Sequence, residues 1–236
     1  MMNSYHLFFD LDRTLWDFDS NSKKALHVIF NDLGLINQMS FNDFYTAYVQ
    51  INSQLWKEYR NNNISKDELR VKRFNDTLLQ LKINNYEMAL YMSNAYIELS
   101  PYQTKLFPYV IETLSVLKKE GYSMHIITNG FKEVQSIKLN KSGLIKYFDM
   151  VICSEEIGCL KPAKEIFSYS LKVSGAQMNN SLMIGDDYKA DIIGAQEFGM
   201  KTLHFIHNKT KYSGQNNGQF SSFKELPLLI PKLFLK

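Results

Sequence analysis

Five short stretches of the chain carry apolar residues at successive positions instead of alternating ones. They read YHLFFDLD at 5–12, SMHIITN at 123–129, DMVICSEE at 149–156, SLMIGDD at 181–187 and KTLHFIH at 201–207. Continuous apolar runs of this length are typical of strands that are buried on both faces. The pattern therefore predicts a parallel sheet that helices cover on both sides.

Helical patterns precede each of the last four strands. They lie at 109–120, 131–142, 162–174 and 188–198. A glycine follows each of them, as is common after the last turn of a helix, and Pro162 occupies a first-turn position that suits proline. Alternating strands and helices predict an α/β fold with a Rossmann-like, doubly wound parallel sheet.

The stretch between the first two strands breaks this alternation. Residues 17–104 carry four helix-like patterns instead, at 20–33, 41–60, 65–81 and 84–99. Aromatic residues are dense here, and amphipathic helices that bury one stripe each predict a helical bundle. We therefore expect two domains, an α/β core formed by 1–16 and 105–236 and an inserted all-helical domain at 17–104.

The chain after His207 is less regular. The polar stretch NKTKYSGQNNGQFSS, rich in glycine and asparagine, predicts a loop. The following FKELPLLIPKLFLK predicts a last short strand or helix.

Composition excludes several classes of protein. The net charge is only +3 over 236 residues and no dense Lys/Arg block occurs, so a nucleic-acid polymer is not an expected partner. No apolar run approaches the roughly 20 residues of a membrane span, and no basic leader precedes the first strand, so we expect a cytoplasmic protein with no membrane partner. Cys153 and Cys159 fit no zinc spacing and are interpreted as free thiols.

Polar side chains gather where the predicted strands end. The sets are Asp10, Asp12, Arg13 and Thr14 after the first strand, Thr128, Asn129 and Gly130 after the second, Lys161 and Pro162 beyond the third, and Asp186, Asp187 and Asp191 after the fourth. Ligands of an open parallel sheet bind beyond the carboxyl ends of its strands. We therefore expect these side chains to converge on one crevice.

This combination of side chains suits phosphoryl transfer. Carboxylates from two strands can share a Mg²⁺ ion, a hard cation that prefers oxygen ligands and makes clustered acids tolerable. A carboxylate can also attack phosphorus and form an aspartyl-phosphate, which divides one difficult step into two. Lysine and hydroxyl donors then bind the oxygens of the transferred group.

The four motifs resemble those of the haloacid dehalogenase-like (HAD) hydrolase superfamily, in the same order and over residues 5 to about 207. The insertion at 17–104 stands where that family carries a helical cap. The stretches FFDLDRTLWDFDSNS, ITNGFKEVQSIKL and EEIGCLKP further resemble its helical-cap phosphatases known as pyrimidine 5'-nucleotidases, which favour noncanonical nucleoside monophosphates. One departure is Arg13, which stands where the family often has glycine; we expect its side chain to point away from both acids.

The resemblance implies a catalytic role for each strand end. Asp10 would be the nucleophile, and Asp12 the general acid for the leaving alkoxide and then the base for the hydrolytic water. Lys161 would neutralise Asp10 and a phosphoryl oxygen. Thr128 and Asn129 would bind the transferring phosphoryl group.

The resemblance also implies a magnesium site. Its ligands would be the Asp10 carboxylate, the main-chain carbonyl of Asp12 and the Asp186 carboxylate, with Asp187 as a further direct or water-mediated ligand. Asp191 and Thr14 would orient the site from outside the ligand set. Glu155 and Glu156 are interpreted as part of a surface turn.

Other readings remain open at this point. The substrate would be a small phosphomonoester, either a pyrimidine nucleoside monophosphate or another compound such as phosphoglycolate or a sugar phosphate. Dehalogenation is disfavoured because it needs no second acid such as Asp12. A receiver-type switch that is phosphorylated on Asp without turnover is disfavoured by its different motif order, and a nucleotide-binding module by the missing Gly-rich loops. The sequence does not indicate an oligomeric state.

Overall fold

The computed structural model describes residues 5–207 and 218–234. The chain forms two compact units, one made of residues 1–18 and 104–236 and the other of residues 19–103. We call the first the α/β unit and the second the helical unit. The units divide after residue 18 and before residue 104, whereas the predicted domain boundaries lie after 16 and before 105; that domain assignment stays a prediction.

The α/β unit is built on a six-stranded sheet in the order β3-β2-β1-β4-β5-β6, with every pair parallel. The strands are β1 (His6–Phe9), β2 (Ser123–Thr128), β3 (Met150–Cys153), β4 (Ser181–Gly185), β5 (Lys201–Phe205) and β6 (Gln219–Phe220). The chain order reverses between β1 and β4, which is the switch point at which such sheets bind ligands. The predicted fold class is confirmed.

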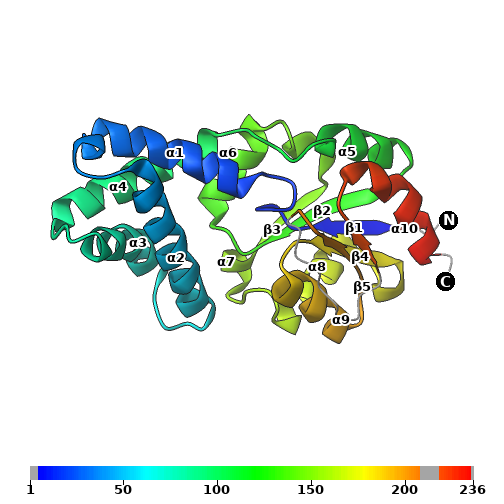
Figure 1. Cartoon of the computed structure of the whole chain (residues 1–236). Coiled ribbons are helices and arrows are strands. Elements are labelled where there is room, and N and C mark those ends of the chain that lie inside the picture. Colours follow the sequence, from blue (N-terminus) through cyan, green and yellow to red (C-terminus); the bar gives the residue numbers. More distant parts are fainter. Residues whose placement is uncertain (1–4, 208–217, 235–236) are drawn as a thin grey trace. The chain divides into compact units, whose positions relative to one another are not determined.

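Alternate residues of the buried strands face opposite layers of helices. In β1, Leu7 and Phe9 pack in a core with α5 (Val110–Lys119), α6 (Lys132–Lys141) and α10 (Leu226–Phe234). Phe8 joins a second core with α8 (Lys164–Ser174) and α9 (Gly194–Phe198). Figure 1 shows these two layers on either side of the sheet. Burial on both faces explains why the strands are apolar at successive positions.

The helical unit consists of four main helices. They are α1, which begins in the α/β unit (Phe18–Asp32), α2 (Phe41–Arg60), α3 (Lys66–Gln80) and α4 (Tyr86–Leu99). The side chains of Ser40, Ser65 and Asn85 cap the starts of the last three and accept hydrogen bonds from free backbone N–H groups there. Phe44, Tyr48 and other aromatic residues form the core of the unit, so the predicted bundle is present.

Short 3₁₀ segments join several of these elements. They are Leu35–Asn37, Ser100–Tyr102, Ile145–Tyr147, Met178–Asn180 and Phe223–Glu225.

Three predicted elements of the α/β unit differ from the structure. The third strand ends at Cys153, and the next residues form a short helix, α7 (Ser154–Ile157). Helix α8 begins at Lys164, so Pro162 precedes the helix and follows Lys161 through a cis peptide bond. The helix expected at 188–198 is divided into a π-helix (Tyr188–Ile193) and α9.

The end of the chain is partly described. Most of the loop predicted after His207 lies outside the described residues, whereas Gln219–Phe220 form an unpredicted strand, β6. The last apolar stretch is the helix α10. Across residues 5–207 and 218–234, every helix is too short or too polar to cross a bilayer.

The two cysteines are free thiols, as interpreted from the sequence. Burial raises the pKa of the Cys153 thiol to about 12, which leaves this group inert at neutral pH.

Candidate active site

Asp10 follows the central strand β1 and lies at the carboxyl edge of the sheet. Its backbone N–H donates to the Ile184 carbonyl of β4 over 2.9 Å, which extends the strand pairing by one residue. The side chain is buried, with 8% of the residue exposed. Its position beside the switch point between β1 and β4 therefore follows directly from the sheet topology.

Lys161 reaches this carboxylate from the loop before α8. Its ammonium lies 2.7 Å from Asp10 Oδ1, 2.7 Å from Asp191 Oδ1 and 2.8 Å from the Ile127 carbonyl oxygen. The ammonium donates hydrogen bonds to Asp10 and to the Ile127 carbonyl, and it forms an ion pair with Asp191. The lysine is 2% exposed, so the whole side chain is enclosed together with its charge.

Asn129 holds the backbone of Lys161 in place. Its Oδ1 accepts from the Lys161 N–H over 2.8 Å, and its Nδ2 donates to the Lys161 carbonyl over 3.0 Å. The side-chain amide thus pairs with both polar groups of one residue. The predicted contact of Asn129 with a phosphoryl group stays a prediction, and the role visible here is to position the lysine.

Thr14 joins the first and the fourth strand ends. Its hydroxyl oxygen lies 3.0 Å from Asp10 Oδ2 and 3.2 Å from Asp186 Oδ1, and it accepts from the Asp186 N–H over 3.1 Å. A hydroxyl has one proton, so the two carboxylates share it as a donor. Thr14 therefore fixes the spacing of two carboxylates that face each other across the switch point.

Three carboxylates form a group that could hold a metal ion. One oxygen each from Asp10, Asp186 and Asp191 lies within 4.8 Å of the others. Oxygen donors of this kind suit Mg²⁺, so the residues present fit the predicted cation. Asp191 is 1% exposed and reaches the group because Gly185 has no side chain, since a Cβ there would lie 2.2 Å from Asp191 Oδ2.

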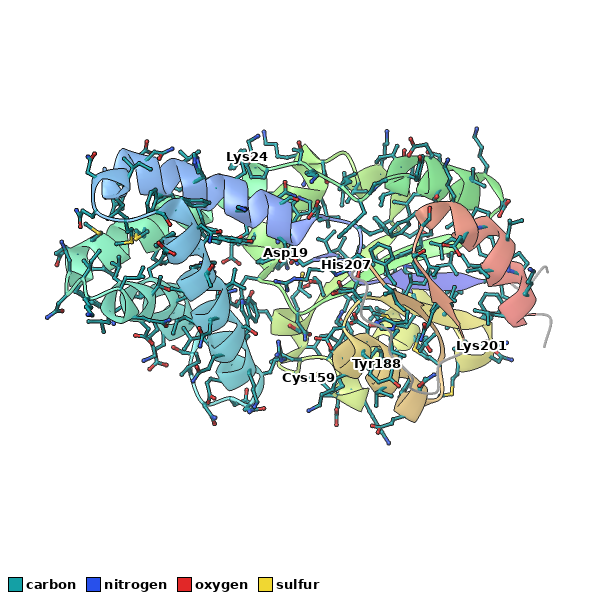
Figure 2. The ribbon with its side chains drawn as sticks, viewed as in Figure 1. Asp19, Lys24, Cys159, Tyr188, Lys201 and His207 are labelled. Atoms are coloured by element: carbon teal, nitrogen blue, oxygen red, sulfur yellow. The ribbon has the colours of Figure 1, made fainter. Side chains whose placement is uncertain are left out.

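Asp186 and Asp187 separate into two roles. The carboxylate of Asp186 faces the acid group, whereas Asp187 Oδ1 caps the π-helix by accepting from the N–H groups of Lys189 and Ala190 over 3.0 and 2.9 Å. His204 Nε2 lies 2.9 Å from the Asp186 carbonyl oxygen. Tyr188 and His207, both labelled in Figure 2, lie beside this strand end, and His207 Nε2 is 3.6 Å from Asp186 Oδ2.

The electrostatics of the group follow from burial and from the single lysine. Burial raises the pKa of Asp10 to about 6, with Lys161 opposing the rise and Asp186 adding to it. Burial also raises the pKa of Asp191 against the same lysine. Burial alone would lower the pKa of Lys161, but Asp10 and Asp191 outweigh it and keep the ammonium charged. The Lys161 cation thus pairs with two of the three carboxylates, and a divalent ion would relieve the remaining repulsion among them.

Asp12 lies at the same edge but has its own partners. Lys138 Nζ is 2.6 Å from its Oδ1, and Gln135 Nε2 donates to its Oδ2 over 2.9 Å. Gln135 also donates to the Thr128 hydroxyl oxygen over 2.7 Å. Both partners come from α6 and were missed in the sequence, where residues 135 and 138 look like ordinary polar positions of a surface helix.

The remaining predicted neighbours lie at the margin of the site. Arg13 adopts φ +68°, a left-handed conformation that glycine reaches most easily, and its guanidinium carbon lies 4.5 Å from the centre of the Phe18 ring. Glu155 and Glu156 belong to α7 instead of a turn. Both contact Lys132, Glu155 by accepting from its backbone N–H and Glu156 by pairing with its ammonium.

Comparison with known proteins identifies a matching family model and relatives that align along nearly the whole chain. The family model described as haloacid dehalogenase-like hydrolase matches residues 7–205. The pyrimidine 5'-nucleotidase YjjG of Escherichia coli is 32% identical over 229 residues, which cover 96% of this chain and 97% of that protein. A glyceraldehyde 3-phosphate phosphatase of Pyrococcus furiosus is 31% identical over 235 residues, or 96% of this chain and 92% of that one.

A solved structure agrees with these relatives. The crystal structure of the HAD-hydrolase YfnB from Bacillus subtilis, bound to magnesium, has a TM-score of 0.87 at 26% identity. The match covers 97% of this chain and 99% of that one.

Proposed function

Because the chain belongs to the haloacid dehalogenase-like hydrolase family and is a phosphatase, we propose that it is a Mg²⁺-dependent phosphomonoesterase with a phospho-Asp10 intermediate. The observation that carries this proposal is the buried Asp10 carboxylate, which Lys161 and Thr14 hold at the switch point of the sheet. A carboxylate fixed from one side in this way is positioned to attack an electrophile from the other.

The first half of the reaction forms the covalent intermediate. An oxygen of Asp10 attacks phosphorus in line with the ester bond, and that bond breaks as the new P–O bond forms. Asp12 donates a proton to the departing alkoxide. Lys161 and the Thr128 hydroxyl stabilise negative charge on the phosphoryl oxygens. A bound Mg²⁺, held by Asp10, Asp186 and the Asp12 carbonyl, would supply further neutralisation of this charge.

The second half releases phosphate. Asp12, now a carboxylate, removes a proton from a water molecule that attacks the same phosphorus, and the bond between phosphorus and Asp10 breaks. Asp10 returns as a free carboxylate, and the proton count is restored. Asp191 keeps Lys161 in place throughout, because its Oδ1 lies 2.7 Å from the ammonium.

For the substrate we propose nucleoside 5'-monophosphates, with pyrimidine nucleotides first. The full-length similarity to a pyrimidine 5'-nucleotidase supports this choice. A sugar phosphate or phosphoglycolate is the second candidate, and the similarity to a glyceraldehyde 3-phosphate phosphatase favours it. The helical unit would act as the cap that selects the leaving group. A cytoplasmic location stays a prediction.

A phosphate-release screen with and without Mg²⁺ tests the proposal. Full-length protein is incubated with nucleoside monophosphates, sugar phosphates and phosphoglycolate, and we expect the highest kcat/KM for a pyrimidine nucleotide. Asp10→Asn should lower turnover by about 10⁴-fold or more while thermal unfolding shows an intact fold. Wild-type turnover by this variant would exclude the nucleophile, and a stable phospho-Asp without phosphate release would support a switch instead of an enzyme.

A further inference from the structure

The Asp12 carboxylate is held by two side chains that belong to no predicted motif. Gln135 and Lys138 lie one turn apart on α6, and each binds one of its oxygens, over 2.9 and 2.6 Å. Gln135 is 0% exposed and Lys138 is 3% exposed. A buried amide and a buried ammonium that meet on one carboxylate restrict its rotation far more than solvent would.

The Gln135 amide also determines how the Thr128 hydroxyl is oriented. One amide proton goes to Asp12 Oδ2 and the other to Thr128 Oγ1, which lies 2.7 Å from Nε2. The same hydroxyl oxygen accepts from the Gly130 N–H over 3.1 Å. Thr128 therefore accepts two hydrogen bonds, and its own proton is directed elsewhere. The reverse amide orientation would place two acceptors against each other.

Surrounding residues keep both side chains in place. A Cβ at Gly130 would lie 2.2 Å from Gln135 Nε2, so the amide occupies space that only glycine leaves free. The Lys138 ammonium lies 4.3 Å from the centre of the Trp16 ring, and Trp16 is 0% exposed. This cation–π contact keeps the ammonium at the Asp12 carboxylate.

We propose that Gln135 and Lys138 are positioning residues for the acid–base chemistry of Asp12, and that Gln135 in addition directs the Thr128 hydroxyl proton toward the phosphoryl group. The proposal rests on the proposed function, since it requires Asp12 to act as the general acid. Each Asp12 oxygen accepts one bond from α6 and keeps a further lone-pair direction for the proton it transfers.

Substrates with different leaving groups distinguish a positioning role of these residues from a purely structural one. An alkoxide leaves poorly without a proton, whereas p-nitrophenolate is a stable anion that leaves without one. Loss of a well-placed acid therefore lowers kcat/KM for an alkyl phosphate much more than for p-nitrophenyl phosphate. The ratio kcat/KM covers the steps up to phosphoryl transfer, so it is insensitive to later hydrolysis of the intermediate.

The experiment compares variants of the full-length protein in Mg²⁺ on two substrates, the best alkyl phosphate of the screen and p-nitrophenyl phosphate. Lys138→Met should lower kcat/KM for the alkyl phosphate by about 10- to 100-fold, which is part of the roughly 10²–10⁴ that general acids contribute. The same variant should change kcat/KM for p-nitrophenyl phosphate by less than about 3-fold. Lys138→Arg should restore most of the loss. Gln135→Met should lower kcat/KM for both substrates, because Thr128 is no longer oriented, and should lower it more for the alkyl phosphate. Lys119→Met, which removes an exposed lysine of α5, should change neither.

Equal losses on both substrates in Lys138→Met, or no loss on either, would overturn the proposal. If Lys138→Met or Gln135→Met fails the thermal-unfolding control, Lys138→Gln and Gln135→Asn are judged by the same ratio, because they keep a polar side chain but change the contact with Asp12. Asp12→Ala is the reference. A uniform loss in Asp12→Ala would show that the role proposed for Asp12 is wrong, which is distinguishable from a wrong role for its two neighbours.

Discussion

Each compact unit encloses a basic side chain, and the two surround it differently. In the α/β unit, Lys161 lies between the carboxylates of Asp10 and Asp191, at 2.7 Å from each. In the helical unit, Arg73 is 6% exposed, and its guanidinium carbon lies 4.5 Å from the centre of the Tyr96 ring and 5.2 Å from that of Phe74. Within the described parts of the chain, no carboxylate pairs with Arg73.

The buried charge of Lys161 belongs to a group of reactive side chains, whereas the buried charge of Arg73 is only packed against aromatic rings. The lysine is one member of a group in which acids outnumber bases, and this excess can be used to bind a cation or to attack phosphorus. The arginine rests on ring faces, which attract a cation without supplying a reactive group. Removing a charge should therefore have unequal consequences in the two units.

The largest effect is expected for Lys161→Met. This change leaves Asp10 and Asp191 buried without their cation, and breaking a buried ion pair costs about 3–5 kcal/mol. Phosphate release should fall by about 10³-fold or more, because the lysine no longer stabilises the transferred group. Denaturant unfolding and steady-state kinetics measure the two effects. A variant as stable as the wild type would contradict the role of this ion pair.

The second-largest effect on stability is expected from the addition of Mg²⁺. A ligand that binds only the folded protein stabilises it by about 2.7 kcal/mol at 100 times its Kd. Protection in hydrogen exchange, read peptide by peptide, should increase around Asp10 and Asp186. Asp186→Asn should remove most of this stabilisation, whereas Asp67→Asn in the helical unit should retain it. An unchanged response in Asp186→Asn would mean that this carboxylate is not a ligand.

Arg73→Met should have a smaller effect on stability. The loss is the cation–π contact with Tyr96 and Phe74, worth about 1–2 kcal/mol, and no carboxylate is left unpaired. Chemical denaturation measures the change, with exposed Lys57→Met as the matched control. If Arg73→Met destabilised the protein as much as Lys161→Met, the distinction between the two surroundings would fail.

The smallest effect concerns acid pH. In the α/β unit, His6 Nδ1 and His125 Nε2 lie 3.0 Å apart, and burial, together with the other histidine, lowers the pKa of His125 to about 4. The native state keeps this group neutral, so its contribution is fully present above pH 6.5 and is lost as the pH falls toward 4. We expect a loss on the order of 1 kcal/mol between pH 6.5 and 5.

Unfolding curves at several pH values measure this loss. His125→Leu should reduce it, whereas replacement of the exposed His27 of the helical unit by glutamine should not. An equal pH dependence in His125→Leu and the wild type would assign the acid sensitivity to other groups.

Sequence patterns predicted the helical unit closely, and the physical reason is its local order. Helix α2 runs over Phe41–Arg60, the range predicted from the pattern of its apolar residues, and Ser40 caps its start. The parallel sheet was also predictable, because parallel strands that are buried on both faces are continuously apolar. The strand β6 was not, since two residues in a polar stretch carry no period and pair only through β5.

The candidate site was predictable where a residue's place depends on a strand end. Asp10 and Asp186 directly follow β1 and β4, so the sheet brings them together. Gln135 and Lys138 depend on how α6 packs over the strand ends, and their spacing resembles that of any amphipathic helix. Whether Asp186 or Asp187 turns toward the acids is decided by the start of the π-helix, which the sequence does not reveal.

The pairing of Asn129 with Lys161 also bears on how this protein ages. An asparagine followed by glycine is the dipeptide most prone to deamidation, because the glycine nitrogen can attack the side-chain carbonyl. Here the Gly130 N–H is bound to Thr128 Oγ1, and both ends of the Asn129 amide are bound to the Lys161 backbone, so the folded chain restrains the attacking nitrogen and the amide that it would attack. Conversion to aspartate would remove the donor to the Lys161 carbonyl and place a negative charge against that carbonyl oxygen, in the loop that carries the partner of Asp10. The folded state thus helps to determine how long Asn129, and with it the support of Lys161, escapes deamidation.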